Sequence, residues 1–125
     1  MVSKALYVDD EPDICRIAEM CLQLNEAFET RSAGSGLEAI DIARSWQPDV
    51  ILLDVMMPGL DGPSTFGHLK ADPLTAQIPV IFVTAKALES DLARLKSHDI
   101  LGVIPKPFQA MTLAEEVREL MNRTG

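Results

Sequence analysis

Four stretches of the sequence carry side chains that could perform chemistry together. Apolar runs end at Asp9 and Asp10, at Asp54, at Thr84 and just before Lys106. Clustered carboxylates repel one another unless a cation lies among them, and oxygen ligands of this kind suit Mg²⁺. An aspartate can accept a phosphoryl group covalently, and a hydroxyl and an ammonium can contact its oxygens. The set predicts Mg²⁺-assisted phosphoryl transfer to Asp54.

Each of these residues also has an ordinary explanation. Asp9 and Asp10 could cap a helix that begins near Pro12, which is a common use of aspartate. Thr84 could be a turn residue and Lys106 a solvated surface lysine. Asp54 is harder to explain in this way, because it directly follows Val-Ile-Leu-Leu and burying its charge brings no structural gain.

Five short apolar or β-branched runs can place these residues at one edge of a sheet. They cover residues 5–8, 28–32, 50–53, 80–83 and 100–104. Most are continuously apolar rather than alternating, which is typical of parallel strands covered on both faces. Ligands of such sheets bind at the carboxyl ends of the strands, where the chemically capable side chains are predicted to lie.

The segments between the predicted strands show apolar residues at the spacing typical of helices. The first helix shows apolar positions at 14, 17, 21 and 24, and the last at 113, 117, 120 and 121. Ser35 with Glu38 and Thr112 with Glu115 match the capping box of a helix start. Segments 62–71 and 87–97 fill the two remaining helical positions. Five β-α units with right-handed crossovers predict an α/β fold with helices on both faces.

Composition limits the classes of function. The 125 residues carry 19 acidic and 11 basic side chains, a formal net charge of −8, which disfavours direct binding to nucleic acid or an anionic membrane. The length predicts one domain over residues 1–125. Cys15 and Cys21 point to different sides of the predicted first helix and are not expected to bridge. With no signal segment and no long apolar run, a cytoplasmic location is expected.

The motifs together resemble the receiver domains of two-component response regulators. The resemblance rests on Asp9-Asp10, on Asp54-Val-Met-Met-Pro-Gly-Leu-Asp-Gly, on Pro79-Val-Ile-Phe-Val-Thr-Ala and on Lys106-Pro107-Phe108, in the order of the family. It covers essentially the whole chain. It implies a flavodoxin-like, doubly wound sheet of five parallel strands in the order 2-1-3-4-5, with five helices.

The resemblance also implies a role for each site residue. Asp54 would accept phosphate from a sensor histidine kinase or a phosphotransfer protein. Asp10, Asp54 and the backbone carbonyl of Met56 would bind Mg²⁺, with Asp9 acting through water. Thr84 and Lys106 would contact the phosphoryl group. A receiver of this kind is not an enzyme acting on other substrates, because it assists only its own phosphorylation and dephosphorylation.

Two positions depart from the family pattern. Val103 stands where an aromatic residue is common, three residues before the lysine, and Pro105 directly precedes Lys106. The family's output face consists of the fourth helix, the fifth strand and the fifth helix. With Val103 in place of a ring, we expect the active state to depend mainly on the loop that carries Lys86 and on the fourth helix, with Arg94 and Lys96 available to an acidic partner.

Several alternatives remain open at this point. The chain is interpreted as a stand-alone regulator that binds a partner, or as a receiver fragment of a larger regulator or hybrid kinase. An aspartate-nucleophile phosphatase would need a second aspartate where Met56 stands. A flavin carrier would need a phosphate-binding loop where Asp9 and Asp10 lie. A phosphotransfer histidine domain would be a helical bundle, whereas His68 and His98 are expected at the surface.

Overall fold

A five-stranded parallel sheet forms the centre of the protein. The computed structural model describes residues 2–85 and 99–123, and its strands lie in the order β2-β1-β3-β4-β5. This confirms the flavodoxin-like, doubly wound order expected from the resemblance. The strands are β1 (Ser3–Val8), β2 (Phe28–Ala33), β3 (Val50–Asp54), β4 (Val80–Thr84) and β5 (Gly102–Pro105).

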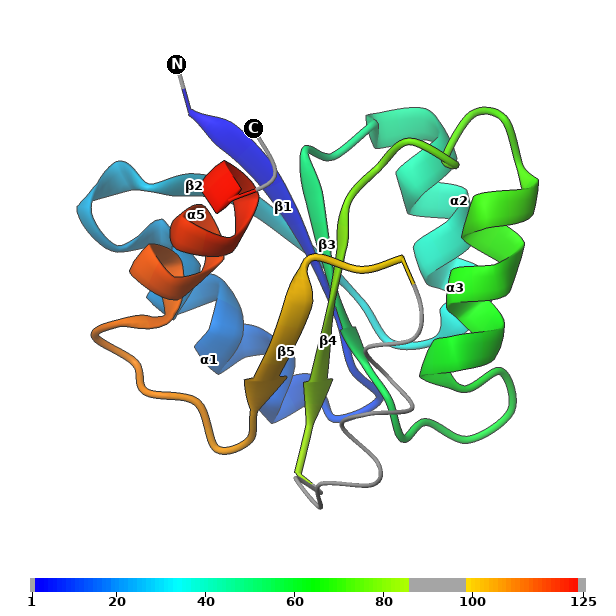
Figure 1. The fold of residues 1–125 in the computed structure, drawn as a ribbon. Helices are drawn as coiled ribbons and strands as arrows, with labels where there is room; N and C mark the ends of the chain where they lie inside the picture. Colours follow the sequence, from blue (N-terminus) through cyan, green and yellow to red (C-terminus); the bar gives the residue numbers. More distant parts are fainter. Residues whose placement is uncertain (1, 86–98, 124–125) are drawn as a thin grey trace.

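Helices cover both faces of the sheet (Figure 1). On one face lie α1 (Pro12–Gln23) and α5 (Leu113–Arg123), and on the other lie α2 (Gly36–Trp46) and α3 (Gly62–Ala71). A short 3₁₀ turn, η1 (Leu24–Glu26), follows α1. These are four of the five predicted helices, and the expected helix at 87–97 lies outside the described residues. None of the helices in the described ranges is long and apolar enough to cross a membrane.

The apolar core is divided by the sheet into two layers. Every residue of β3 and of β4 is buried, which explains why these runs are continuously apolar up to their last residues. Leu6, Leu53 and Phe82 belong to the layer under α2 and α3, and Tyr7 and Ile81 to the layer under α1 and α5. The central strands therefore form a rigid support for whatever their carboxyl ends carry.

The predicted inner face of the first helix is partly wrong. Ile17 is 48% exposed, and Leu24 is 41% exposed because it lies beyond the end of α1. Of the predicted positions, Cys21 is buried and Ile14 is partly buried against the core, and Cys15, Ala18 and Leu22 complete the buried side of α1. Cys15, Ala18 and Cys21 are small and let the helix pack closely on the sheet. Both thiols are free, as expected, and both are buried.

The capping boxes are realised only in part. Ser35 Oγ accepts a hydrogen bond from the Glu38 N–H at 3.1 Å, as predicted, but Glu38 Oε1 accepts from the Gly34 N–H instead of the Ser35 N–H. At the last helix the Thr112 hydroxyl donates to Glu116 Oε1 at 3.0 Å rather than pairing with Glu115. The side chain one residue beyond Glu115 contacts Thr112, so the S/T-x-x-E pattern located the helix start but misidentified the partner.

Candidate functional site

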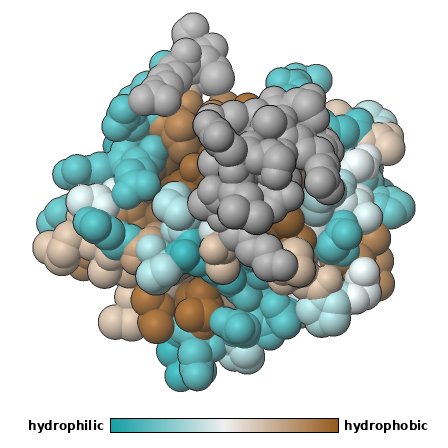
Figure 2. Space-filling view, turned by 60° about the horizontal axis from the view of Figure 1, so that its bottom comes forward, coloured by the Kyte–Doolittle hydropathy of each residue, from teal (hydrophilic) through white to brown (hydrophobic). Residues whose placement is uncertain are grey.

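The side chains singled out from the sequence meet at one edge of the sheet. Asp9 follows β1, Asp54 is the last residue of β3, Thr84 is the last residue of β4, and Lys106 follows β5. All the strands are parallel, so their carboxyl ends lie at the same edge. Figure 2 is turned toward this edge, where hydrophilic and hydrophobic residues are both exposed beside the grey atoms.

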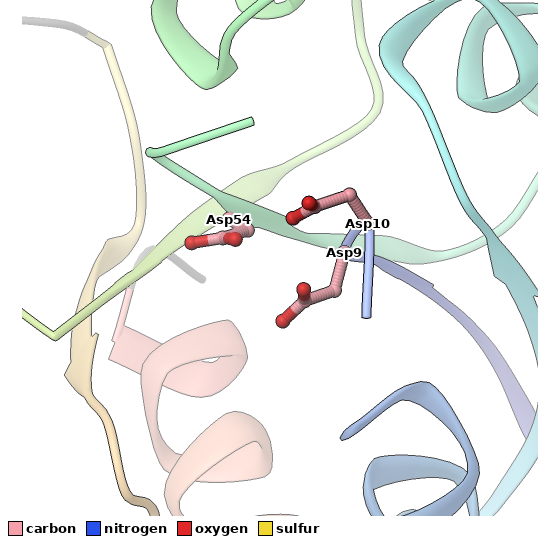
Figure 3. A group of neighbouring side chains, drawn as sticks. All are labelled: Asp9, Asp10 and Asp54. Atoms are coloured by element: carbon pink, nitrogen blue, oxygen red, sulfur yellow. The ribbon is translucent and has the colours of Figure 1, made fainter. Parts of the chain in front are cut away.

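Three carboxylates form the centre of this site. One oxygen from each of Asp9, Asp10 and Asp54 lies within 4.8 Å of the others. Figure 3 shows the three side chains extending to the same side of the strand ends. Asp9 is fully buried and Asp54 is 4% exposed, whereas Asp10 is open to solvent. The site thus combines two carboxylates under protein cover with one that solvent can reach.

Lys106 balances part of this negative charge. Its Nζ lies 2.6 Å from Asp9 Oδ2 and 3.3 Å from Asp54 Oδ2. Its backbone N–H donates to the Thr84 carbonyl at 2.8 Å, which extends the pairing of β5 with β4 to the lysine. Burial alone would lower the pKa of the Lys106 ammonium, but the hydrogen bond to Asp9 and the charges of both carboxylates raise it above the usual value.

Asp54 is held in an environment unfavourable to its charge. Burial, and then the neighbouring charge of Asp9, raise the pKa of Asp54 to about 6, although Lys106 and the Met56 N–H act in the opposite direction. The Met56 N–H lies 3.4 Å from Asp54 Oδ1. A group that brings positive charge to Asp54 would therefore relieve an existing electrostatic cost.

Asp9 is oriented by several donors. The Tyr7 hydroxyl donates to Asp9 Oδ2 at 3.2 Å, and the Glu11 N–H donates to Asp9 Oδ1 at 3.0 Å. Burial first, and the Asp9 charge next, raise the pKa of Tyr7, so the phenol remains a donor. Tyr7 was not among the site residues predicted from the sequence. Its position two residues before Asp9 in a strand, where alternate side chains share a face, was the signal that could have identified it.

Asp10 differs from Asp9 in having no competing partner. Within the described ranges, its carboxylate forms no hydrogen bond or ion pair, and it lines a pocket of about 300 Å³ together with Asp9, Arg16 and Glu38. A hard cation prefers several oxygen ligands and keeps part of its water. The carboxylates of Asp10 and Asp54 fit such an ion, because among residues 2–85 and 99–123 no donor contacts the Asp10 carboxylate and because burial and Asp9 disfavour the charge of Asp54.

The loop after β3 approaches the site closely. The Gly62 N–H donates to the Val55 carbonyl at 3.0 Å, and a Cβ on Gly62 would lie 2.5 Å from the Asp54 carbonyl oxygen. Only glycine fits there without moving the backbone of Asp54. Gly59 in the same loop has φ of +73°, a conformation that glycine adopts readily. The loop between Asp54 and Gly62 thus folds back closely on the end of β3.

The other residues singled out from the sequence differ in their exposure to solvent. Thr84 is 2% exposed, and the Met56 side chain is 60% exposed beside the site. The Lys106–Pro107 peptide bond is cis. Val103 pairs with Phe82 and is partly buried against the core layer under α2 and α3. Lys86, Arg94 and Lys96 lie outside the described residues.

Comparison with known families decides the classification. Residues 5–118 match the response regulator receiver domain family. The chain belongs to this family. The match covers all of the site described above, and it decides against the flavin-carrier, phosphatase and phosphotransfer-histidine alternatives. His68 of this receiver domain is exposed on α3, as expected, and His98 lies outside the described residues.

Relatives of the receiver domain include longer proteins. It is 36% identical over 121 residues to the probable transcriptional regulatory protein TcrX of Mycobacterium tuberculosis, and these residues are 96% of this chain and 50% of the relative. It is 37% identical over 120 residues to the response regulator PleD of Caulobacter vibrioides, covering 96% of this chain and 26% of PleD. The receiver domain therefore spans half or less of the length of these two relatives.

Solved structures of similar length share the fold. The chemotaxis protein CheY4 of Vibrio cholerae matches with a TM-score of 0.87 at 26% identity, over 96% of this chain and 99% of that one. A putative response regulator from Chloroflexus aurantiacus matches with a TM-score of 0.87 at 28% identity, over 98% of this chain and all of that one. The receiver domain is thus similar in extent to these two solved chains.

Proposed function

We propose that this receiver domain accepts a phosphoryl group on Asp54 from the phosphohistidine of a sensor histidine kinase or phosphotransfer protein. The observation that carries the proposal is the position of Asp54: it ends a fully buried strand, lies 3.3 Å from the Lys106 ammonium, and has the carboxylates of Asp9 and Asp10 beside it. Phosphorylation on aspartate is typical of the family to which the chain belongs.

The transfer is an in-line displacement at phosphorus. An oxygen of the Asp54 carboxylate forms the new P–O bond while the P–N bond to the donor imidazole breaks. The imidazole leaves with the electron pair of that bond and takes a proton from solvent. The Lys106 ammonium and the Thr84 hydroxyl contact the phosphoryl oxygens and stabilise the charge that Asp54 gains.

The carboxylates of Asp10 and Asp54 and the backbone carbonyl of Met56 would hold Mg²⁺, and Asp9 would act through water. When bound, the ion supplies positive charge that offsets the phosphoryl group and orients it. The fit is supported by the absence of protein donors on the Asp10 carboxylate within the described residues and by the raised pKa of Asp54. Asp9 is already held by Tyr7, Glu11 and Lys106, in accord with an indirect role.

Phosphorylation is proposed to switch the binding of a partner. We place the switching surface on the face that includes β5 and α5, with residues 1–125 acting as one receiver unit. The named relatives include a probable transcriptional regulator, so the same unit could equally control an output domain in a longer protein. In either case the receiver is the signal-accepting part, and it does not itself contact nucleic acid or membrane.

Intact mass measured after incubation with Mg²⁺ and acetyl phosphate tests the proposal. The chain is expected to gain one phosphoryl group, stable in acid and labile in base, and Asp54→Asn is expected to gain none. Asp61→Asn is the matched control, since it makes the same change at an exposed residue of the same loop, and asparagine can still cap α3 as Asp61 does. Labelling that persists in Asp54→Asn would show that another residue is the acceptor.

A further inference from the structure

Asp9 carries the most completely buried charge of the site. One of its side-chain partners, Lys106, also contacts Asp54. The exposure of Asp9 is 0%, so each of its oxygens must be satisfied within the protein. Oδ1 accepts from the Glu11 N–H at 3.0 Å. Oδ2 accepts from two side chains, the Lys106 ammonium at 2.6 Å and the Tyr7 hydroxyl at 3.2 Å.

The Lys106 ammonium cannot contact Asp9 and a phosphoryl group on Asp54 equally closely. Its Nζ is nearer to Asp9 Oδ2, at 2.6 Å, than to Asp54 Oδ2, at 3.3 Å. Contact with a phosphoryl group on Asp54 requires the ammonium to turn away from Asp9. If Asp9 had no other side-chain partner, the loss of the ammonium would leave its buried charge unsatisfied, and this cost would oppose the transfer.

Tyr7 is placed to prevent that loss. Its ring is 0% exposed within β1, and it meets the ring of Phe108 edge-on, with centroids 6.1 Å apart and planes at 70°. Packing therefore fixes the ring independently of Lys106. The hydroxyl remains against Asp9 Oδ2 whichever carboxylate the lysine contacts.

We infer that Tyr7 is a positioning residue for phosphoryl transfer, whose hydroxyl keeps Asp9 satisfied while Lys106 moves from Asp9 to the phosphoryl group on Asp54. The inference rests on the proposed function, because it presupposes an acceptor at Asp54. Tyr7 touches neither the phosphoryl group nor the proposed Mg²⁺ ligands Asp10 and Asp54. It acts through Asp9 and, by way of Asp9, on Lys106.

Tyr7→Phe separates this role from the packing role of the ring. The variant keeps the ring and its contact with Phe108 and removes only the hydroxyl. Lys106 then becomes the sole side-chain partner of Asp9 among the described contacts and is held there more firmly. We expect phosphorylation at saturating acetyl phosphate and Mg²⁺ to slow roughly tenfold, the effect of one hydrogen bond to a buried charge. The half-saturating Mg²⁺ concentration should change little.

Thr75→Val is the matched control for the loss of a buried hydroxyl. Thr75 is also 0% exposed, and its hydroxyl donates to the Leu69 carbonyl at 2.6 Å, after α3 and before β4 begins. It lies toward the amino-terminal edge of the sheet, away from Asp54. Both variants should melt at lower temperature than the wild type, but only Tyr7→Phe should lower the maximal phosphorylation rate.

The experiment compares wild type, Tyr7→Phe and Thr75→Val by melting temperature, by maximal phosphorylation rate, and by half-saturating concentrations of Mg²⁺ and beryllofluoride. A reduced rate and weaker beryllofluoride binding confined to Tyr7→Phe support the inference. An unchanged rate in Tyr7→Phe, or an equal loss in Thr75→Val, overturns it while the wild type is still phosphorylated. A wild type that gains no phosphoryl group overturns the proposed function itself.

Discussion

Lys106 Nζ lies 3.3 Å from Asp54 Oδ2 although the two residues come from strands that are not neighbours. In the sheet, β4 lies between β3, which ends at Asp54, and β5, which precedes Lys106. Asp54 ends β3 and Lys106 follows β5, so the two side chains meet at the carboxyl edge of the sheet. The long side chain of Lys106 spans the width of β4 and brings the ammonium close to the Asp54 carboxylate. This proximity also makes Asp54 and Lys106 a pair whose charges depend on each other.

The charge of Asp54 makes the fold less stable as pH rises. Burial and the Asp9 charge raise the pKa of Asp54 from 3.8 to about 6, so the folded state binds the proton more tightly than the unfolded chain within that window. The contribution of Asp54 to stability is therefore present below pH 3.8 and lost as pH rises toward 6. Asp54→Asn cannot ionise and should be on the order of 2–3 kcal/mol more stable than the wild type at neutral pH.

Urea unfolding at a series of pH values measures this difference. The advantage of Asp54→Asn should grow between about pH 4 and pH 6 and then level off. Asp41→Asn, at an exposed position on α2, is the control and should show no such pH dependence. A difference between Asp54→Asn and wild type that is the same at low and neutral pH would contradict the raised pKa.

Mg²⁺ binding should depend on Asp10. Asp10→Ala removes an exposed carboxylate that has no protein partner among the described residues, and the affinity for Mg²⁺ should fall at least roughly tenfold. NMR shifts of the Met56 and Asp54 amides report the binding. Asp41→Ala makes the same change of charge on α2 and should bind Mg²⁺ like the wild type. Equal phosphorylation rates with EDTA present would rule out the need for the metal.

The lifetime of the phosphorylated state should depend on Met56. Its side chain is 60% exposed beside the site, and a thioether neither acts as a base nor readily orients water. We expect moderately slow self-dephosphorylation, and Met56→Asn should speed it by roughly tenfold or less. Met111→Asn changes an 80% exposed methionine outside the site and serves as the control. The decay of the phosphorylated mass peak gives the rates, and equal decay in all three proteins would refute the role of Met56.

Val103 should contribute little to the conformational change that follows phosphorylation. Valine buries less area than an aromatic residue in either state, so it contributes little to the choice between them. Beryllofluoride should shift backbone NMR signals mainly between Thr84 and Lys96 in the wild type, and further into β5 in Val103→Tyr. If the wild type already shows its largest shifts at residues 100–104, Val103 takes part in the switch like any other residue.

The loop after β3 should tolerate no side chain at Gly62. A Cβ there would lie 2.5 Å from the Asp54 carbonyl oxygen and 2.8 Å from Val55 Cα, and neither backbone atom can move freely. Gly62→Ala should cost about 1–3 kcal/mol of unfolding free energy and slow phosphorylation. Gly67→Ala, in the same helix with open space around the new methyl group, should instead stabilise by about 0.5–1 kcal/mol. Equal stabilities of the two variants would contradict the close approach.

The sequence by itself determined the order of the elements and the edge of the sheet that carries the chemistry. Continuous apolar runs can be recognised in the sequence because both faces of β3 and β4 are covered. Each of these runs ends at a polar residue, Asp54 in β3 and Thr84 in β4. Asp54, Thr84 and Lys106 could therefore be assigned to one edge before any distance was known. These are local properties of the chain, since each depends on a residue and its immediate neighbours.

Only the tertiary structure decided which donors each carboxylate receives. The competition of Tyr7 and Lys106 for Asp9 Oδ2 joins β1 to the segment after β5, and the approach of Gly62 to the Asp54 carbonyl depends on how the loop folds back. The inner face of α1 was partly mispredicted for the same reason, because packing on the sheet buries Ala18 and Leu22 and leaves Ile17 exposed. Periodicity identifies a helix, but contacts between distant segments fix its rotation and the partners of a buried charge.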